Sequence, residues 1–192
     1  MNQRNAILGV VILTIVVLSV GYFLVQSRTV SFYGTSYEPA LTASDFELVD
    51  QHQTSFRLSD QQNKIVVLYF GYTHCPDECP LSMAKMKNVF DLLNEDGSDI
   101  DVVLITTDPV RDTPEVLADY MTKFNPVFFG LTGDKEALRK VYADYGVTVL
   151  DDGETHSSRL YVIDRKGRLR MTWAYELTAS KIAADLRFLR RE

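Results

Sequence analysis

FGYTHCPDECP, residues 70–80, carries both cysteines of the 192-residue chain. It continues from residues 64–72, an apolar run rich in β-branched and aromatic residues, which predicts a strand buried on both faces. After Pro80 the apolar residues recur at three- and four-residue steps, which predicts a helix beginning near that proline. Cys75 and Cys79 therefore lie where the carboxyl end of a strand meets a helix. Because the helix dipole stabilises a thiolate there, we expect a lowered thiol pKa for one of them.

Three residues separate Cys75 from Cys79, whereas the redox motif of thioredoxins has two. This spacing permits a shared metal ion, a disulfide after modest adjustment, or two buried thiols. Thiolates favour soft cations such as Cu(I), and two thiolates with one imidazole make a three-coordinate site. A structural disulfide remains the plain alternative, although Pro76, Pro80 and the junction position argue against it.

The composition is that of one globular domain with a short appendage. The chain is 46% hydrophobic and 24% charged, with a net charge of −6 and a pI near 5.1. Basic residues form no run outside Arg190-Arg191, so nucleic acid is excluded as a partner.

The amino terminus predicts a membrane anchor. Residues 6–25 carry no charge, and their number matches the roughly 20 residues that a helix needs to cross a bilayer. The run is too long for the apolar core of a cleaved signal peptide, and neither cysteine is close enough to be acylated. We expect residues 1–5 in the cytoplasm, a single transmembrane helix at 6–25, and the rest on the periplasmic or outer face of a bacterial inner membrane.

The remaining chain predicts a linker followed by one α/β domain. Residues 26–43 are polar and interrupted by Gly and Pro, so they are interpreted as a linker or a loosely docked arm, and the domain covers 44–192. Strands are predicted at 45–50, 55–58, 99–107, 127–130, 159–163 and 169–174, and helices at 114–124, 134–145 and 180–191, with Thr113 capping the first and Gly146 ending the second.

Several motifs resemble one known family. The stretch 70–80 is similar to the signature of the Sco/SenC proteins, membrane-anchored copper chaperones with a thioredoxin-like fold. The supporting motifs are DFEL at 45–48, LSD at 58–60, TDP at 107–109, RDTP at 111–114, HS at 156–157, YVID at 161–164 and GRL at 167–169. The resemblance implies an α/β, thioredoxin-like fold with a central mixed β-sheet flanked by helices, preceded by one N-terminal transmembrane helix.

The resemblance also implies a copper site and a set of partners. Cys75, Cys79 and His156 would bind one copper per chain, as Cu(I) or Cu(II), and Asp108 would orient a ligand or meet a partner. The expected acceptor is the binuclear copper site of cytochrome c oxidase subunit II, and other copper chaperones or a thiol reductant are expected partners. The family commonly has Asp before the histidine, where this chain has Thr155, and Glu154 is a possible substitute.

Four other sulfur or imidazole side chains are interpreted as uninvolved. His74 is expected to be a partly exposed loop residue, and His52 lies in an early turn far from the motif. Met83 and Met86 have the spacing of core residues on the predicted helix, so packing is favoured over copper ligation.

Three functions remain open. The first is a copper-binding assembly factor that passes its metal by ligand exchange. The second is an enzyme, a thiol-disulfide oxidoreductase in which one of Cys75 and Cys79 attacks and the other resolves. The third is a peroxidase, which would need a Thr where this chain has Tyr72.

Overall fold

The computed structural model describes residues 3–26, 32–93, 98–150 and 159–192. The chain forms two compact units, Met1–Phe32 and Tyr33–Glu192, which are described separately. The first contains helix α1, Gln3–Gln26, in which Leu13 and Leu18 are exposed. Within the described ranges, no helix has both the length and the apolarity required to cross a membrane.

The second unit is built on one mixed sheet. Its strands are ordered β1-β8-β7-β4-β5-β6-β2-β3, and the three central strands β4, β5 and β6 run parallel, while the other pairs are antiparallel. The strand bounds are Thr35–Thr42 (β1), Glu47–Asp50 (β2), Ser55–Arg57 (β3), Ile65–Gly71 (β4), Ile100–Thr106 (β5), Phe129–Thr132 (β6), Arg159–Ile163 (β7) and Arg168–Ala174 (β8).

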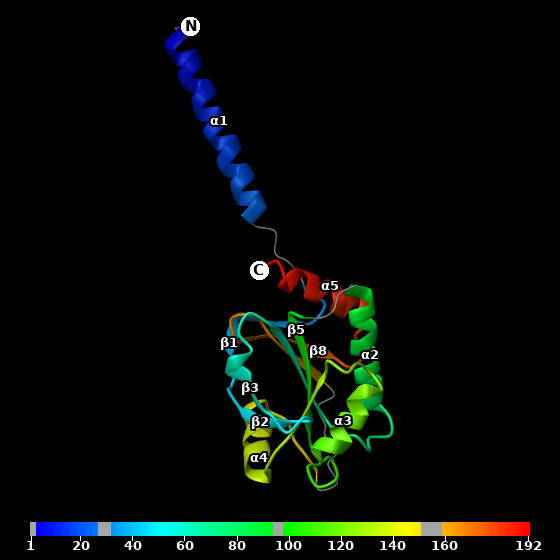
Figure 1. The fold of residues 1–192 in the computed structure, drawn as a ribbon. Coiled ribbons are helices and arrows are strands. Elements are labelled where there is room, and N and C mark those ends of the chain that lie inside the picture. The colour runs from blue at the N-terminus through cyan, green and yellow to red at the C-terminus, as the bar shows by residue number, and fades with distance from the viewer. Residues whose placement is uncertain (1–2, 27–31, 94–97, 151–158) are drawn as a thin grey trace. The chain divides into compact units, whose positions relative to one another are not determined.

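Helices cover both faces of this sheet (Figure 1). They are α2 (Glu78–Leu93), α3 (Pro114–Thr122), α4 (Lys135–Asp144) and α5 (Ala179–Leu189), with a short 3₁₀ turn at Leu58–Asp60. Helix α2 packs against α5, and α3 packs against β6, whereas α4 lies on the other face beside β2.

The alternation of side chains along β4 divides the core into two layers. Val66, Leu68 and Phe70 belong to the cluster that also contains Leu138, Val141 and Tyr142 of α4. Because successive side chains of a strand point to opposite faces, Tyr69 points to the side of α2, and Gly71 lies on that same side. All seven residues of β4 are buried, which confirms the predicted two-sided strand.

Most predicted elements are present with small shifts. The strands β2 to β5, the β7–β8 hairpin and helices α3 to α5 are confirmed, and β6 begins two residues later than expected. Asp134 caps α4 by accepting from the N–H of Glu136 and Ala137, and Gly146 ends it with φ at 66°. Met83 and Met86 are fully buried, as their interpretation as core residues requires.

The prediction of a linker or a loosely docked arm is wrong for residues 35–42. These form β1, which pairs antiparallel with β8 at one edge of the sheet, with a shift in register between Ser36 and Leu41. Its side chains are exposed or half-buried, and it contains Pro39, a residue that sheets tolerate on edge strands. Because both faces of β1 are largely exposed, its sequence has no apolar alternation from which a strand could be predicted. Backbone pairing with β8 holds it in place.

Candidate functional site

The two cysteines lie at the carboxyl edge of β4, where the chain turns into α2. Cys75 lies in the turn and is half-buried, whereas Cys79 belongs to the first turn of α2 and is only 4% exposed. The backbone N–H of Cys79 donates to Cys75 Sγ at 3.4 Å, which holds the two residues side by side. Both thiols are free, and the predicted strand–helix junction is confirmed.

Helix α2 begins two residues earlier than predicted. It starts at Glu78 rather than near Pro80, and the N–H of Leu81 donates to the carbonyl of Asp77 at 3.3 Å. Pro80 fits because the first backbone nitrogens of a helix have no helical acceptor, so its missing N–H costs nothing there. The earlier start places Cys79 inside the helix and buries its thiol.

Gly71 provides the space that Cys79 occupies. A Cβ at position 71 would lie 2.7 Å from Cys79 Sγ and 2.7 Å from Cε1 of Tyr69. Real Cβ atoms do not approach other heavy atoms so closely, so any larger residue would displace the helix or the strand. The glycine at the end of β4 therefore sets how closely α2 packs at the cysteines.

The environment of Cys79 favours the neutral thiol. Burial raises the pKa of the Cys79 thiol to about 12, although a hydrogen bond from the backbone of Tyr72 lowers it. The Tyr69 hydroxyl donates to Cys79 Sγ at 3.7 Å. The expectation of a lowered thiol pKa is therefore wrong for Cys79, because desolvation outweighs the hydrogen bonds from Tyr72 and Tyr69.

Asp108 lies just beyond β5, at the same edge of the sheet as the cysteines. Its N–H donates to Thr106 Oγ1 at 2.9 Å, and its carboxylate accepts from the guanidinium of Arg111. The Arg111 guanidinium lies 6.0 Å from the ring centre of Tyr72. Asp108 therefore reaches the cysteine loop through Arg111, and its predicted role at the metal site stays a prediction.

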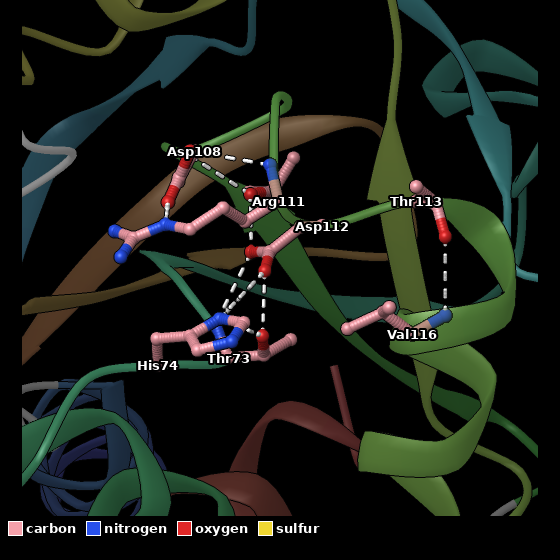
Figure 2. A network of polar contacts seen from close by, with 8 residues as sticks. Thr73, His74, Asp108, Arg111, Asp112, Thr113 and Val116 are labelled. Carbon is pink, nitrogen blue, oxygen red and sulfur yellow. Dashed lines mark hydrogen bonds and ion pairs between the residues drawn. The ribbon is translucent and has the colours of Figure 1, made fainter.

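Asp112 is a residue that the sequence reasoning missed. Its side chain is fully buried and accepts hydrogen bonds from Thr73 (Figure 2). It also accepts one from the hydroxyl of Thr106. The available sequence signal was its place in the RDTP motif, directly before the cap of α3. Thr113 caps the N-terminus of α3 by accepting a hydrogen bond from the N–H of Val116, so the predicted cap is confirmed.

Of His74 and His156, only His74 lies among the residues that the structure describes. His156, with Thr155 and Glu154, lies in 151–158, outside the described residues, so its predicted role as a ligand is not tested. His74 has a half-exposed ring whose Nδ1 lies 3.0 Å from Thr73 Oγ1. In the described part of the chain, no group of three or more His, Cys, Asp or Glu side chains could hold a metal ion.

The cysteine junction and the mixed sheet agree with a known family. The profile described as SCO1/SenC matches residues 34–190. The chain belongs to the SCO1/SenC family. A relative of this SCO1/SenC chain is the SCO2-like protein of Rickettsia felis, which is 34% identical, and the match covers 88% of this chain and 90% of the relative.

Solved structures of the family share the fold. The copper-bound ScoI of Bradyrhizobium japonicum is 32% identical with a TM-score of 0.68, and the match covers 78% of this chain and 99% of that one. The apo Sco1 of Thermus thermophilus is 32% identical with a TM-score of 0.72, covering 85% and 99%. The expected thioredoxin-like α/β fold with a mixed sheet is therefore confirmed.

Proposed function

We propose that this SCO1/SenC protein binds one copper ion through Cys75, Cys79 and His156 and serves cytochrome c oxidase assembly, with the binuclear copper site of subunit II as its acceptor. The observation that carries the proposal is the pair of free, adjacent thiols at the strand–helix junction. A relative with the same fold has been solved with copper bound.

The donor set fits a soft metal ion. Two cysteine sulfurs and one imidazole suit copper, which thiolates bind in preference to harder cations. Since only the thiolate is a metal ligand, binding must release the proton of Cys79, whose raised pKa keeps it bound in the metal-free chain. The chain's own part is to hold Cys75 and Cys79 adjacent, so that an acceptor can take the metal by ligand exchange.

Copper stoichiometry and absorption of the reduced full chain test this function. The variants are Cys75→Ser, Cys79→Ser and His156→Ala, with His52→Ala as a matched control in the β2–β3 turn. We expect one copper per wild-type chain and a thiolate-to-Cu(II) charge-transfer band that all three site variants lose and His52→Ala keeps. A wild-type chain that retains no copper would overturn the proposal.

A second function, thiol-disulfide exchange with the acceptor, is favoured by the unequal exposure of the cysteines. Cys75 is half-buried and Cys79 is 4% exposed, the arrangement of an attacking and a resolving thiol. The Cys75 thiolate would attack an acceptor disulfide, form a mixed disulfide and release the first acceptor thiol. Cys79 would then attack Cys75 Sγ, giving a Cys75–Cys79 disulfide and releasing the second acceptor thiol. An external dithiol would reduce the pair again and become oxidised itself.

We also propose that residues 6–25 anchor the chain in a bacterial inner membrane, with the folded unit on the periplasmic or outer face. The proposal is supported by the uncharged sequence of these residues and by the helical form of α1. When membranes are washed with alkaline carbonate and pelleted, the full chain should stay in the pellet. A variant with Leu13→Lys and Val17→Lys should be released into the supernatant. Release of the wild-type chain would contradict the anchor.

A further inference from the structure

The buried carboxylate of Asp112 joins two loops at the cysteine edge of the sheet (Figure 2). It accepts from the backbone N–H of Thr73 at 3.1 Å, from Thr73 Oγ1 at 2.6 Å and from Thr106 Oγ1 at 2.6 Å. Its side chain has no exposed surface. Two of the three donors belong to Thr73, which lies two residues before Cys75.

Burying a carboxylate has to be offset by strong partners. An unpaired buried charge costs several kcal/mol, whereas hydrogen bonds to an ionised acceptor are short and roughly twice as strong as neutral ones. The two hydroxyl contacts of Asp112, at 2.6 Å, have the length expected of such bonds. Two of the three hydrogen-bond donors to this buried group therefore belong to Thr73, and His74 Nδ1 lies 3.8 Å from Asp112 Oδ1.

The other side of Asp112 is fixed to the scaffold. Its own N–H donates to the carbonyl of Asp108 at 3.0 Å, and the next residue, Thr113, caps α3. Thr106, its third partner, is the last residue of β5 and is fully buried. Asp112 thus belongs to a rigid corner made by β5 and the start of α3.

Thr73 passes this restraint to the residues beside Cys75. Its hydroxyl carries one proton, which goes to Asp112, so the 3.0 Å contact with His74 is made by His74 Nδ1–H donating to Thr73 Oγ1. The loop is held again at its start, where the N–H of Thr107 donates to the carbonyl of Gly71 at 2.8 Å. Cys75 follows these two restraints directly, and its own N–H donates to the carbonyl of Tyr72 at 3.3 Å, so its position depends on the loop that Thr73 holds.

We propose that Asp112 is a positioning residue that fixes Cys75 beside Cys79 by holding Thr73 from the β5–α3 corner. The copper-binding consequence rests on the proposed function, whereas the effect on the metal-free thiols does not. Asp108 does not share the role, because its carboxylate is directed to Arg111.

The test compares Asp112→Ala with a matched variant in the full, reduced and metal-free chain. Asp164 is a suitable match: it is 7% exposed and accepts from the N–H of Lys166 and Arg168 in the β7–β8 turn, beside the opposite end of β4. The readouts are the alkylation rate of Cys75 by iodoacetamide and amide hydrogen exchange at residues 73–75. Copper affinity is measured separately.

We expect Asp112→Ala to speed both alkylation and exchange and to weaken copper binding about tenfold, the usual effect of losing a group that orients a metal ligand. Asp112→Asn, which keeps one oxygen for the Thr73 N–H, should give intermediate values. Asp164→Ala should lower the melting temperature and leave Cys75 unchanged. Wild-type Cys75 reactivity in Asp112→Ala, or the same increase in Asp164→Ala, would overturn the proposal.

Thr73→Val decides the question if Asp112→Ala does not fold, because it removes only the hydroxyl donor. Faster alkylation of Cys75 in Thr73→Val supports the proposal, and an unchanged rate overturns it. If the wild-type chain binds no copper but the alkylation results hold, the proposed function fails and the positioning role of Asp112 stands.

Discussion

Gly71 and Cys79 approach each other so closely that no methyl group fits between them. A Cβ at position 71 would lie 2.7 Å from Cys79 Sγ. The last residue of β4 and the first turn of α2 are therefore fitted to each other, and this contact determines where the buried thiol lies.

Gly71→Ala should destabilise the protein. Overpacking a tight core site costs about 1–3 kcal/mol, and here the added methyl group also meets the ring of Tyr69. Urea unfolding of the reduced full chain measures the loss. Gly133→Ala is the control, since its Cβ would meet only the flexible end of Leu48, at 2.9 Å, and should cost less. Equal stability of Gly71→Ala and wild type would contradict the packing argument.

The two thiols should react at different rates. Cys79 is 4% exposed and burial raises its pKa to about 12, whereas Cys75 is half-buried in the turn. Iodoacetamide at pH 8, followed by mass spectrometry of the peptides, should label Cys75 well before Cys79. In urea both should react alike. Faster labelling of Cys79 than of Cys75 in the folded chain would contradict the burial of the Cys79 thiol.

The sequence predicted the parts of the fold that local pattern determines. The apolar β-branched runs of β4 and β5 and the helical spacing of α2 are continuous along the chain, so the strand–helix junction and both cysteines could be found without the structure. Strand β1 could not, because its stability comes from pairing with β8, as in Thr35 opposite Thr172, and not from its own residue pattern.

The chemical environment of the site was less predictable than its location. The burial of Cys79 depends on α2 starting at Glu78 and on the space above Gly71, which are matters of three-dimensional packing. The role of Asp112 depends on Thr73, 39 residues away in the chain. Neither relationship leaves a local pattern, although the motif containing Asp112 was visible.

The difference in stability between Asp101→Asn and the wild-type chain should depend on pH. Burial raises the pKa of Asp101, and Lys64 Nζ, 3.0 Å away, lowers it only in part. The folded state thus favours the neutral acid, so the wild-type chain loses stability as pH rises from about 4, where the unfolded carboxyl ionises, through the raised pKa. Asp101→Asn lacks this penalty and should gain stability relative to wild type between pH 4 and pH 7, measured by urea unfolding.

Asp99→Asn should show the opposite trend and serves as the control for Asp101. Burial raises the pKa of Asp99, but hydrogen bonds and charges from Arg190 and Arg165 outweigh it, so the pKa is lowered overall. The wild-type chain keeps this stabilisation above the unfolded pKa and loses it as pH falls through the lowered value. Asp99→Asn should therefore be less stable than wild type at pH 7 and approach it at low pH. The same pH trend in both variants would contradict these assignments.

His156→Ala should separate the two proposed functions. Loss of a ligand should weaken copper binding by more than about tenfold, since even groups that only orient a ligand contribute 10–100-fold. Disulfide exchange needs only Cys75 and Cys79, so the rate at which the reduced chain cleaves a small disulfide should stay at the wild-type value. His52→Ala, in the β2–β3 turn, is the matched control for the loss of an imidazole elsewhere in the chain. Unchanged copper affinity in His156→Ala would remove this histidine from the site, whereas loss of copper binding and exchange together would mean that residue 156 supports the thiols themselves.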